Sequence, residues 1–516
     1  MHAQDGPQGR EEPPGPRDKL AEGHSLVRYG AAGGRWVLLA SILGSALAAL
    51  DATVVNVALP VLGEELDAGL SGLQWTLNGY LLTLSALILT DGALGDRYGR
   101  RRMFIAGVVW FTAASLLCGL ALNLEMLVAA RVLQGVGGAL LTPASLAIIQ
   151  ASFHPEDRAR AVGAWSGLSG VSAAIGPLFG GYMIDALSWR FIFWLNVPLA
   201  AIVIFVSVRH VPETHDPTSV RRPDILGAAA IGAGLAGVTF ALIEAPERGA
   251  GSPLVLVAVV VGVAGFAGFV LVERRGSHPM IPPDIFSSHQ FTAANLVTGI
   301  VYASLSGVFF LLTVHFQQVL GYSPLQAGLA TVPLTLLMLA LSARAGELAQ
   351  RIGPRLPMSA GPVGMAAGMV AMSTISAGSG YFTGVVPSVI IFGFGLSLTV
   401  APLTATVLAS ADDRHAGVAS GINNAVARIA GLVAVAALPV AAGLTGSDYL
   451  DPAAFAPGFR TAMLISAALS LAGGVLAWIT IRNDVLPSKA PARRHHCAVD
   501  GAPLQPHNRH LTASRP

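Results

Sequence analysis

Two charged side chains stand inside long apolar stretches of this 516-residue chain. Asp51 lies fifteen residues beyond Trp36 in one such stretch, which is roughly 22 Å into a helix. A carboxylate at that depth costs at least ~2.5–3.5 kcal/mol unless it is paired, hydrated or protonated. Asp51 is therefore a candidate proton carrier, or a counter-charge for a cationic substrate. The alternative is a structural hydrogen bond to the neighbouring backbone.

Arg131 is the second buried charge, and arginine stays charged at any physiological pH. It lies five residues from the outer end of its apolar stretch, whereas Asp51 lies eight from the outer end of its own. Their depths then differ by only ~5 Å. An arginine that close can stabilise the ionised carboxylate and release it on protonation. The alternative is a static clamp between two helices.

The composition indicates that membrane-spanning helices carry these residues. The chain is 53% hydrophobic and 12% charged, with a mean hydropathy of +0.63, whereas a soluble domain is about 25% charged. Its two cysteines, Cys118 and Cys497, provide neither a disulfide nor a metal site. No span contains a nucleophile–base pair, a phosphate loop or a nucleotide motif. We expect a polytopic membrane protein that is not an enzyme and needs no cofactor, metal or nucleic acid.

Fourteen apolar runs are long enough to cross a bilayer core of ~30 Å. An even number of spans places both termini on one side of the membrane. Of the 31 lysines and arginines, only three lie in loops on the opposite side, namely Arg190, Arg248 and Arg460. This asymmetry predicts cytoplasmic termini in the cell membrane. The runs cover residues 36–59, 74–94, 103–122, 126–149, 161–185, 191–208, 224–244, 253–273, 292–315, 326–349, 357–377, 384–408, 417–443 and 459–481.

An internal repeat predicts how the spans are organised. The stretch Gly92–Arg102 matches Gly346–Arg355 at an offset of 254 residues, and Gly163–Gly167 matches Gly417–Gly421 at the same offset. Duplicated halves are typical of transporter folds. A shift of eight helices keeps the two halves parallel. We expect a disordered tail at 1–35, six-helix halves at 36–209 and 281–481, a link with two inserted helices at 210–280, and a disordered tail at 482–516.

The stretch Gly92–Arg102 joins two of the spans in a tight, arginine-rich turn. Its glycines let two helix ends approach closely, and Asp96 can pair with an arginine on a neighbouring helix end. Such a pair can form in one conformation and break in another. The stretch is therefore a candidate conformational latch, with the members Gly92, Asp96, Arg97, Gly99 and Arg101.

Together these motifs resemble the major facilitator superfamily, and more narrowly its fourteen-span drug:proton antiporters. Gly92–Arg102 is similar to the loop motif of the superfamily. Leu50–Pro60 resembles the L-D-x-T-x-x-N-x-A-L-P motif of the fourteen-span branch, and Arg131–Ala139 resembles the R-x-x-Q-G motif of span four. Gly176–Gly181 resembles the G-P-x-x-G-G antiporter motif of span five. The resemblance covers nearly everything between residues 36 and 481.

The resemblance implies a residue-by-residue assignment. Asp51 would sense the proton or cation, and Arg131 would couple to it. The antiporter motif, Gly176, Pro177, Gly180 and Gly181, would mark export rather than uptake. The cavity would lie at mid-depth between the halves. Candidates for its lining are Asn56, Tyr80, Gln134, Trp165 and Gln317.

The leading hypothesis is a secondary active efflux transporter for multidrug and antibiotic resistance. It would export small lipophilic drugs, antibiotics or related metabolites in exchange for protons, and would act in the lipid bilayer as a monomer, because two halves already form one cavity. The alternative is proton-coupled uptake or export of one specific metabolite. A membrane sensor without transport is the third reading.

Overall fold

The computed structural model describes residues 26–214, 224–276, 280–281, 283–411, 416–446 and 448–486. Nearly all of them are helical. The helices are α2 (Ala32–Glu65), α3 (Leu70–Leu87), α4 (Asp91–Tyr98), α5 (Arg100–Gly119), α6 (Leu124–Ser152), α7 (Pro155–Ala186), α8 (Arg190–Trp194), α9 (Asn196–His210), α10 (Ile225–Arg248), α11 (Pro253–Arg275), α12 (His289–Gln318), α13 (Pro324–Ala330), α14 (Val332–Ile352), α15 (Arg355–Met372), α16 (Val386–Ala409), α17 (Ala416–Ala441) and α18 (Pro452–Thr480), with short turns η1 (Pro283–Ser287), η2 (Tyr381–Val385) and η4 (Asp448–Leu450).

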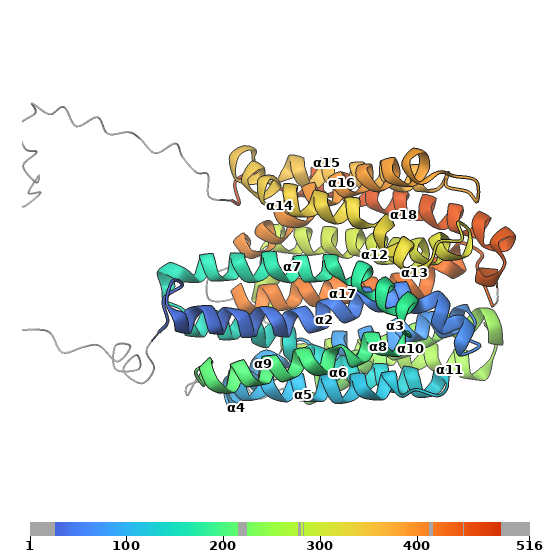
Figure 1. The fold of residues 1–516 in the computed structure, drawn as a ribbon. Helices are drawn as coiled ribbons and strands as arrows, with labels where there is room; N and C mark the ends of the chain where they lie inside the picture. The colour runs from blue at the N-terminus through green and yellow to red at the C-terminus, as the bar shows by residue number, and fades with distance from the viewer. Residues whose placement is uncertain are drawn as a thin grey trace, which may run out of the picture.

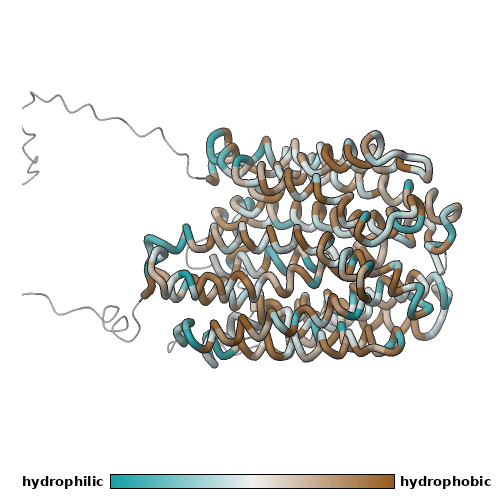
Figure 2. The backbone as a smooth tube through the Cα atoms, viewed as in Figure 1, coloured by the Kyte–Doolittle hydropathy of each residue, from teal (hydrophilic) through white to brown (hydrophobic). Residues whose placement is uncertain are grey.

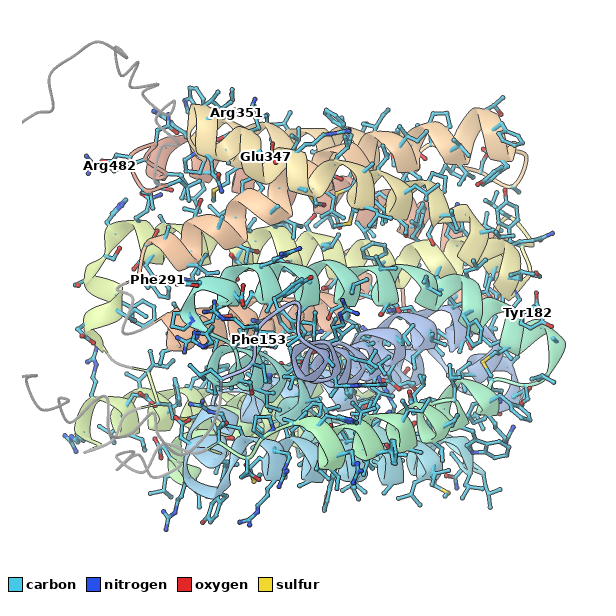
Figure 3. All side chains as sticks on the ribbon, turned by 60° about the vertical axis from the view of Figure 1, so that its left-hand side comes forward. Phe153, Tyr182, Phe291, Glu347, Arg351 and Arg482 are labelled. Carbon is cyan, nitrogen blue, oxygen red and sulfur yellow. The ribbon has the colours of Figure 1, made fainter. Side chains whose placement is uncertain are left out.

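The long helices lie side by side and run from one end of the molecule to the other (Figure 1). Hydrophobic residues dominate their length, and hydrophilic residues collect toward the two ends (Figure 2). We call the end where α2 begins the terminal end. Glu347 and Arg351, near the end of α14, lie at this end with Arg482, whereas Tyr182 of α7 lies at the distal end (Figure 3).

Twelve helices of the described chain are long and apolar enough to cross a membrane. α8 and α9 together form one of them, and α13 and α14 form another. α3 and α15, with 18 residues each, are not among the twelve. Most spans extend beyond the predicted runs, since α2 begins at Ala32 and continues to Glu65. The predicted disordered tails fall mostly outside the described residues.

Burial separates central helices from peripheral ones. The most apolar windows of α2 and α12 are each 61% buried, whereas that of α11 is 17% buried and has the highest hydropathy. α11 therefore faces the lipid. α10 packs on α11 and also contacts both α3 and α17. The indole N–H of Trp75 in α3 donates to Glu244 of α10 at 2.9 Å, which ties this helix pair to the main bundle.

The two copies of the internal repeat share one backbone conformation at the start of a helix. Gly99 and Gly353 precede α5 and α15 with positive φ angles of 100° and 88°. In the first copy the backbone N–H of Arg101 donates to Glu213 at 3.1 Å. In the second copy the backbone N–H of Arg355 donates to Asn483 at 3.1 Å. Each copy thus uses a side chain from beyond its last helix to bind a free N–H at a helix start.

Gly99→Ala is expected to destabilise the protein, because a Cβ at this φ is strained and would lie 2.5 Å from Oε1 of Glu213. The expected loss is about 1–3 kcal/mol. Gly95→Ala is the matched control, since its Cβ would meet nothing closer than 3.6 Å and alanine favours the helix. Thermal unfolding of the two purified variants checks this, and equal melting temperatures would contradict it.

Candidate functional site

Asp51 and Arg131 form an ion pair in the interior of the first half of the bundle. Nη1 of Arg131 in α6 lies 2.5 Å from Oδ2 of Asp51 in α2. Each side chain is 1% exposed. Both helices run through apolar surroundings, so each charge has the other as its compensation. The structure thus brings together the two residues whose depths the sequence placed within about a helical turn.

Two other residues complete the pair's hydrogen bonding, and the ring of Tyr80 lies against the guanidinium. Gln134 donates from Nε2 to Oδ1 of Asp51 at 2.8 Å and accepts from Nη1 of Arg131 at 2.7 Å. Nε of Arg131 donates to the carbonyl of Thr76 in α3 at 3.1 Å. The guanidinium carbon lies 4.5 Å from the ring centroid of Tyr80. Both carboxylate oxygens are therefore bound, and the arginine is held by α2, α3 and α6.

This closed network compensates both charges. An ionised Asp51 accepts from Arg131 and Gln134 and neutralises the arginine. Loss of either charge would leave the other one buried without compensation, which is strongly unfavourable. The ion pair therefore links α2 to α6 as long as both groups are charged.

The antiporter-like motif of α7 lies directly beside the turn of α2 that follows Asp51. A Cβ at Gly176 would collide with Thr53, and one at Gly180 would collide with Val54. At Gly181 a Cβ would lie 2.5 Å from the carbonyl oxygen of Pro324 at the start of α13. These glycines, together with Pro177 between them, let α7 pack closely on α2 and on α13.

The contact between α7 and α13 is close from both sides. A Cβ at Gly328 of α13 would collide with the carbonyl of Pro177. The carboxylate of Asp185, at the end of α7, accepts from the Ser323 hydroxyl at 2.7 Å and from the backbone N–H of Leu325 at 3.1 Å. The start of α13 is further fixed by a capping box between Ser323 and Gln326.

Further contacts between the two halves lie at the same distal end. Nε2 of Gln74 in α3 donates to the carbonyl of Val435 in α17 at 2.7 Å. Gln317 of α12, one of the predicted cavity residues, donates to the carbonyl of Val57 in α2 at 2.9 Å. Leu70 donates its N–H to the carbonyl of Gly446 at 2.9 Å. The distal end is therefore closed.

The glycines of α7 that lie nearer the terminal end have no such close neighbours. Gly163, Gly167 and Gly170 would each accept a Cβ with nothing within 4 Å. The face of α7 that carries these three glycines therefore has no close neighbour among the described residues. Another face of the same part of α7 is packed, since Ala161 is buried and Trp165 donates to Ser45 at 2.9 Å.

The predicted latch residues are distributed over two contacts. Asp96 pairs with Arg100 at 2.8 Å, four residues along the chain. Arg101 lies 3.6 Å from Glu213 and donates to the carbonyl of Val211 at 3.0 Å. Arg97 lies over the ring of Tyr98, and Gly92 is part of α4. Glu213 was not a predicted member, because it lies more than a hundred residues away in the sequence.

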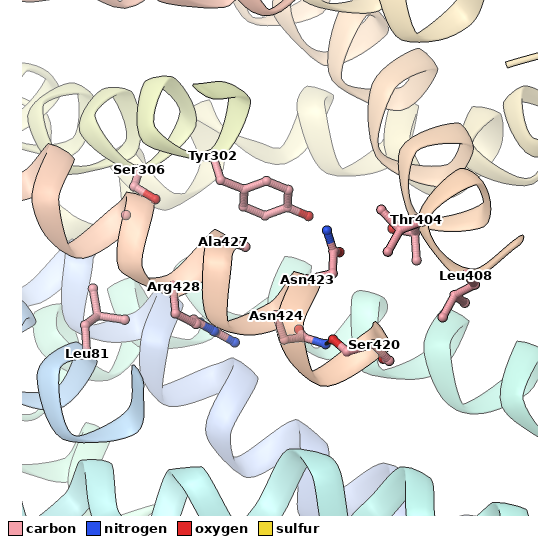
Figure 4. A pocket seen from close by; sticks show the side chains of 12 residues that line it. Leu81, Tyr302, Ser306, Thr404, Leu408, Ser420, Asn423, Asn424, Ala427 and Arg428 are labelled. Atoms are coloured by element: carbon pink, nitrogen blue, oxygen red, sulfur yellow. Dashed lines mark hydrogen bonds between the residues drawn. The ribbon is translucent and has the colours of Figure 1, made fainter. Parts of the chain in front are cut away.

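The remaining predicted cavity residues occupy other positions. Tyr80 and Gln134 are buried within the charge cluster. Asn56 donates to the carbonyl of Ala52 in its own helix at 2.9 Å, and Trp165 donates to the hydroxyl of Ser45 at 2.9 Å. A cavity of ≈ 280 Å³ lies instead beside α3, α12, α16 and α17 (Figure 4), and its polar lining includes Tyr302, Asn423, Asn424 and Arg428.

The chain is similar to several named bacterial resistance and export proteins. The chain is 33% identical to a tetracenomycin C resistance and export protein of Streptomyces glaucescens, with 80% of this chain and 76% of the relative covered. It is 34% identical to a puromycin resistance protein of Streptomyces alboniger, with 86% and 91% covered.

A solved structure shares the fold. The crystal structure of a bacterial homolog of the human lysosomal transporter Spinster, inward-facing and occupied, superposes with a TM-score of 0.59 over 89% of this chain and 99% of that one, at 17% identity. The sequence profile of the Major Facilitator Superfamily matches residues 41–435. On this match and these relatives, the chain belongs to the major facilitator superfamily of membrane transporters, and is not an enzyme.

Proposed function

We propose that this protein exports small lipophilic drugs or antibiotics across the cell membrane in exchange for protons. The observation that carries the proposal is the buried ion pair between Asp51 and Arg131. Asp51 shortly precedes Thr53 and Val54 of α2, which pack on the glycine-rich part of α7. Relatives that cover most of the chain are named for resistance to, or export of, tetracenomycin C and puromycin. Their names support antibiotics as the class of compound, and the ion pair would supply the means of coupling.

The coupling follows from the packing around Asp51. Protonation breaks the pair with Arg131 and lets α2 move. Thr53 and Val54 of α2 lie against Gly176 and Gly180 of α7, and α7 lies against α13 of the second half. A movement of α2 therefore reaches the distal contact between the halves and can open it. Substrate would leave there, and loss of the proton would restore the pair and the closed distal end.

The direction of transport rests on the placement of the chain in the membrane. Arginines gather at the terminal end, and few lie in the distal loops. This pattern supports cytoplasmic termini. The cavity described above would then open toward the cytoplasm, from which an exporter collects its substrate. A membrane potential of 100 mV supplies ~2.3 kcal/mol for each proton that enters.

The architecture we propose has fourteen spans and acts as a monomer. α3 and α15 each have 18 residues, which is ~27 Å of helix and close to the bilayer core. α3 packs on α6, α10 and α17, and α15 packs on α16 and α18. With them, each half has six spans, and α10 and α11 are the inserted pair between halves at 36–209 and 281–481.

Export can be tested in intact cells. The protein is expressed in a drug-sensitive bacterium, and the intracellular amounts of puromycin and tetracenomycin C are compared with those in vector-only cells. We expect lower accumulation of at least one compound, and a return to the control value when a protonophore collapses the proton gradient. Equal accumulation of both compounds in the two strains would argue against the proposed substrates. A lower accumulation that survives the protonophore would argue against proton exchange.

A further inference from the structure

The cavity beside α3, α12, α16 and α17 carries a positive charge. Arg428 lies near the middle of α17 and lines the cavity together with Asn423 and Asn424 of the same helix. Tyr302 of α12 forms the facing wall, and Leu81 of α3 reaches the cavity from the first half (Figure 4). The cavity is thus built at the boundary between the halves, where a transported molecule must be held.

Arg428 differs from Arg131 in what surrounds it. Within the described residues, no carboxylate lies within ion-pair distance of its guanidinium, and none accepts a hydrogen bond from it. The charges of Asp51 and Arg131 cancel in their own cluster. Among the described residues, the lining of this cavity therefore carries one formal positive charge, that of Arg428. An uncompensated arginine inside a membrane protein is unfavourable unless water or a ligand compensates it.

Some uncharged polar groups of the cavity are engaged within the protein, and others are available as donors. The amide nitrogen of Asn423 donates to the hydroxyl of Thr298 at 2.8 Å, and that of Asn424 donates to the carbonyl of Ser420 at 3.0 Å. In the described chain, the hydroxyls of Tyr302 and Ser306 make no hydrogen bond within the protein. These hydroxyls and the guanidinium can all donate to an oxygen acceptor. Leu81, Val407 and Leu408 supply the apolar wall.

We propose that this cavity selects organic anions. The acidic group of the substrate, a carboxylate or a phenolate, binds Arg428, and its apolar body lies against Leu81, Val407 and Leu408. The inference deepens the proposed export function and rests on it. It also changes the substrate class that Asp51 alone suggested, because the charge of Asp51 is matched by Arg131 and is not available to a cation.

A pair of dyes with one ring system and opposite charges tests the inference. Fluorescein, at a pH where it is ionised, and the cation rhodamine 123 are titrated into the purified full-length protein, and binding is followed by fluorescence anisotropy. We expect fluorescein to bind at least about tenfold more tightly. A preference for rhodamine 123, or no binding of fluorescein, would overturn the inference.

Variants assign the preference to Arg428. We expect Arg428→Gln to weaken fluorescein binding about tenfold or more and to leave the binding of rhodamine 123 unchanged. Arg428→Lys should retain part of the preference. Tyr302→Phe should weaken fluorescein binding severalfold, and it provides a second test in case the glutamine variant does not fold. Arg344→Gln is the matched control, because Arg344 is exposed on α14 and does not line the cavity. Unchanged fluorescein binding in both the glutamine and the phenylalanine variants would overturn the assignment.

Proton exchange is measured separately, so that the two proposals can fail independently. Fluorescein binding without substrate-dependent proton movement would retain the anion site and refute the proposed antiport. Proton-coupled efflux of cations or neutral drugs, by a protein that binds no fluorescein, would retain the antiport and refute the anion site.

Discussion

Replacing Asp51 with asparagine is expected to abolish proton-driven export and to lower the free energy of unfolding by about 3–5 kcal/mol. Among the described residues, Asp51 is the carboxylate that pairs with Arg131, whose side chain is 1% exposed, and the change removes its charge. It also removes the group that we propose takes up the proton. Drug accumulation in cells measures the first effect, and thermal unfolding of the purified protein measures the second.

A double variant separates the two effects. Asp51→Asn combined with Arg131→Gln removes both charges, so most of the lost stability should return, because a buried pair can be replaced by neutral groups at little cost. Export should stay absent, because no titratable carboxylate remains among the described residues of this cluster. If the double variant regained export, Asp51 would be a structural partner of Arg131 and not the proton carrier. Asp484→Asn serves as a control for loss of a single carboxylate, because the Asp484 side chain is 70% exposed and lies outside the membrane-spanning helices.

Gly181→Ala is expected to have the second largest effect. Its Cβ would lie 2.5 Å from the carbonyl oxygen of Pro324 and 2.7 Å from Cα of Leu325, both backbone atoms that cannot swing aside. Either the distal contact between α7 and α13 opens, or the protein loses about 1–3 kcal/mol of stability through overpacking. We expect reduced export and greater reactivity of a cysteine placed at the distal end.

Gly268→Ala provides the matched comparison. Gly268 also lies within an apolar helix, α11, but a Cβ there would meet no atom closer than 3.9 Å. Export and cysteine reactivity should therefore stay close to those of the unaltered protein. Equal behaviour of the Gly181 and Gly268 variants would show that the close approach of α7 and α13 has no part in transport.

Much of the fold can be predicted from the sequence, because uninterrupted apolar runs of bilayer length admit few structures other than helices. The depth of Asp51 and Arg131 along their runs placed both at a similar level, and the structure joins them at 2.5 Å. The repeat at an offset of 254 residues anticipated the matching turns at Gly99 and Gly353.

The sequence could not show which way side chains point around a helix that is apolar on most sides. Gln134 and Tyr80 were expected at the cavity but turn toward Arg131. Glu213 contacts the Gly92–Arg102 turn because α9, the last helix of the first half, ends beside that turn. Arg428 lies within the apolar run 417–443, yet its place in a cavity depends on how α12, α16 and α17 pack together, which the run itself does not reveal.

Proton movement in inside-out membrane vesicles tests the central claim most directly. Vesicles containing the protein, or its Asp51→Asn variant, are given a preset pH gradient, and puromycin and tetracenomycin C are added while a dye reports the internal pH. We predict that at least one compound dissipates the gradient in vesicles with the unaltered protein and has no effect in those with the variant. Equal dissipation in both would contradict the account, because protons would then cross without the carboxylate of Asp51.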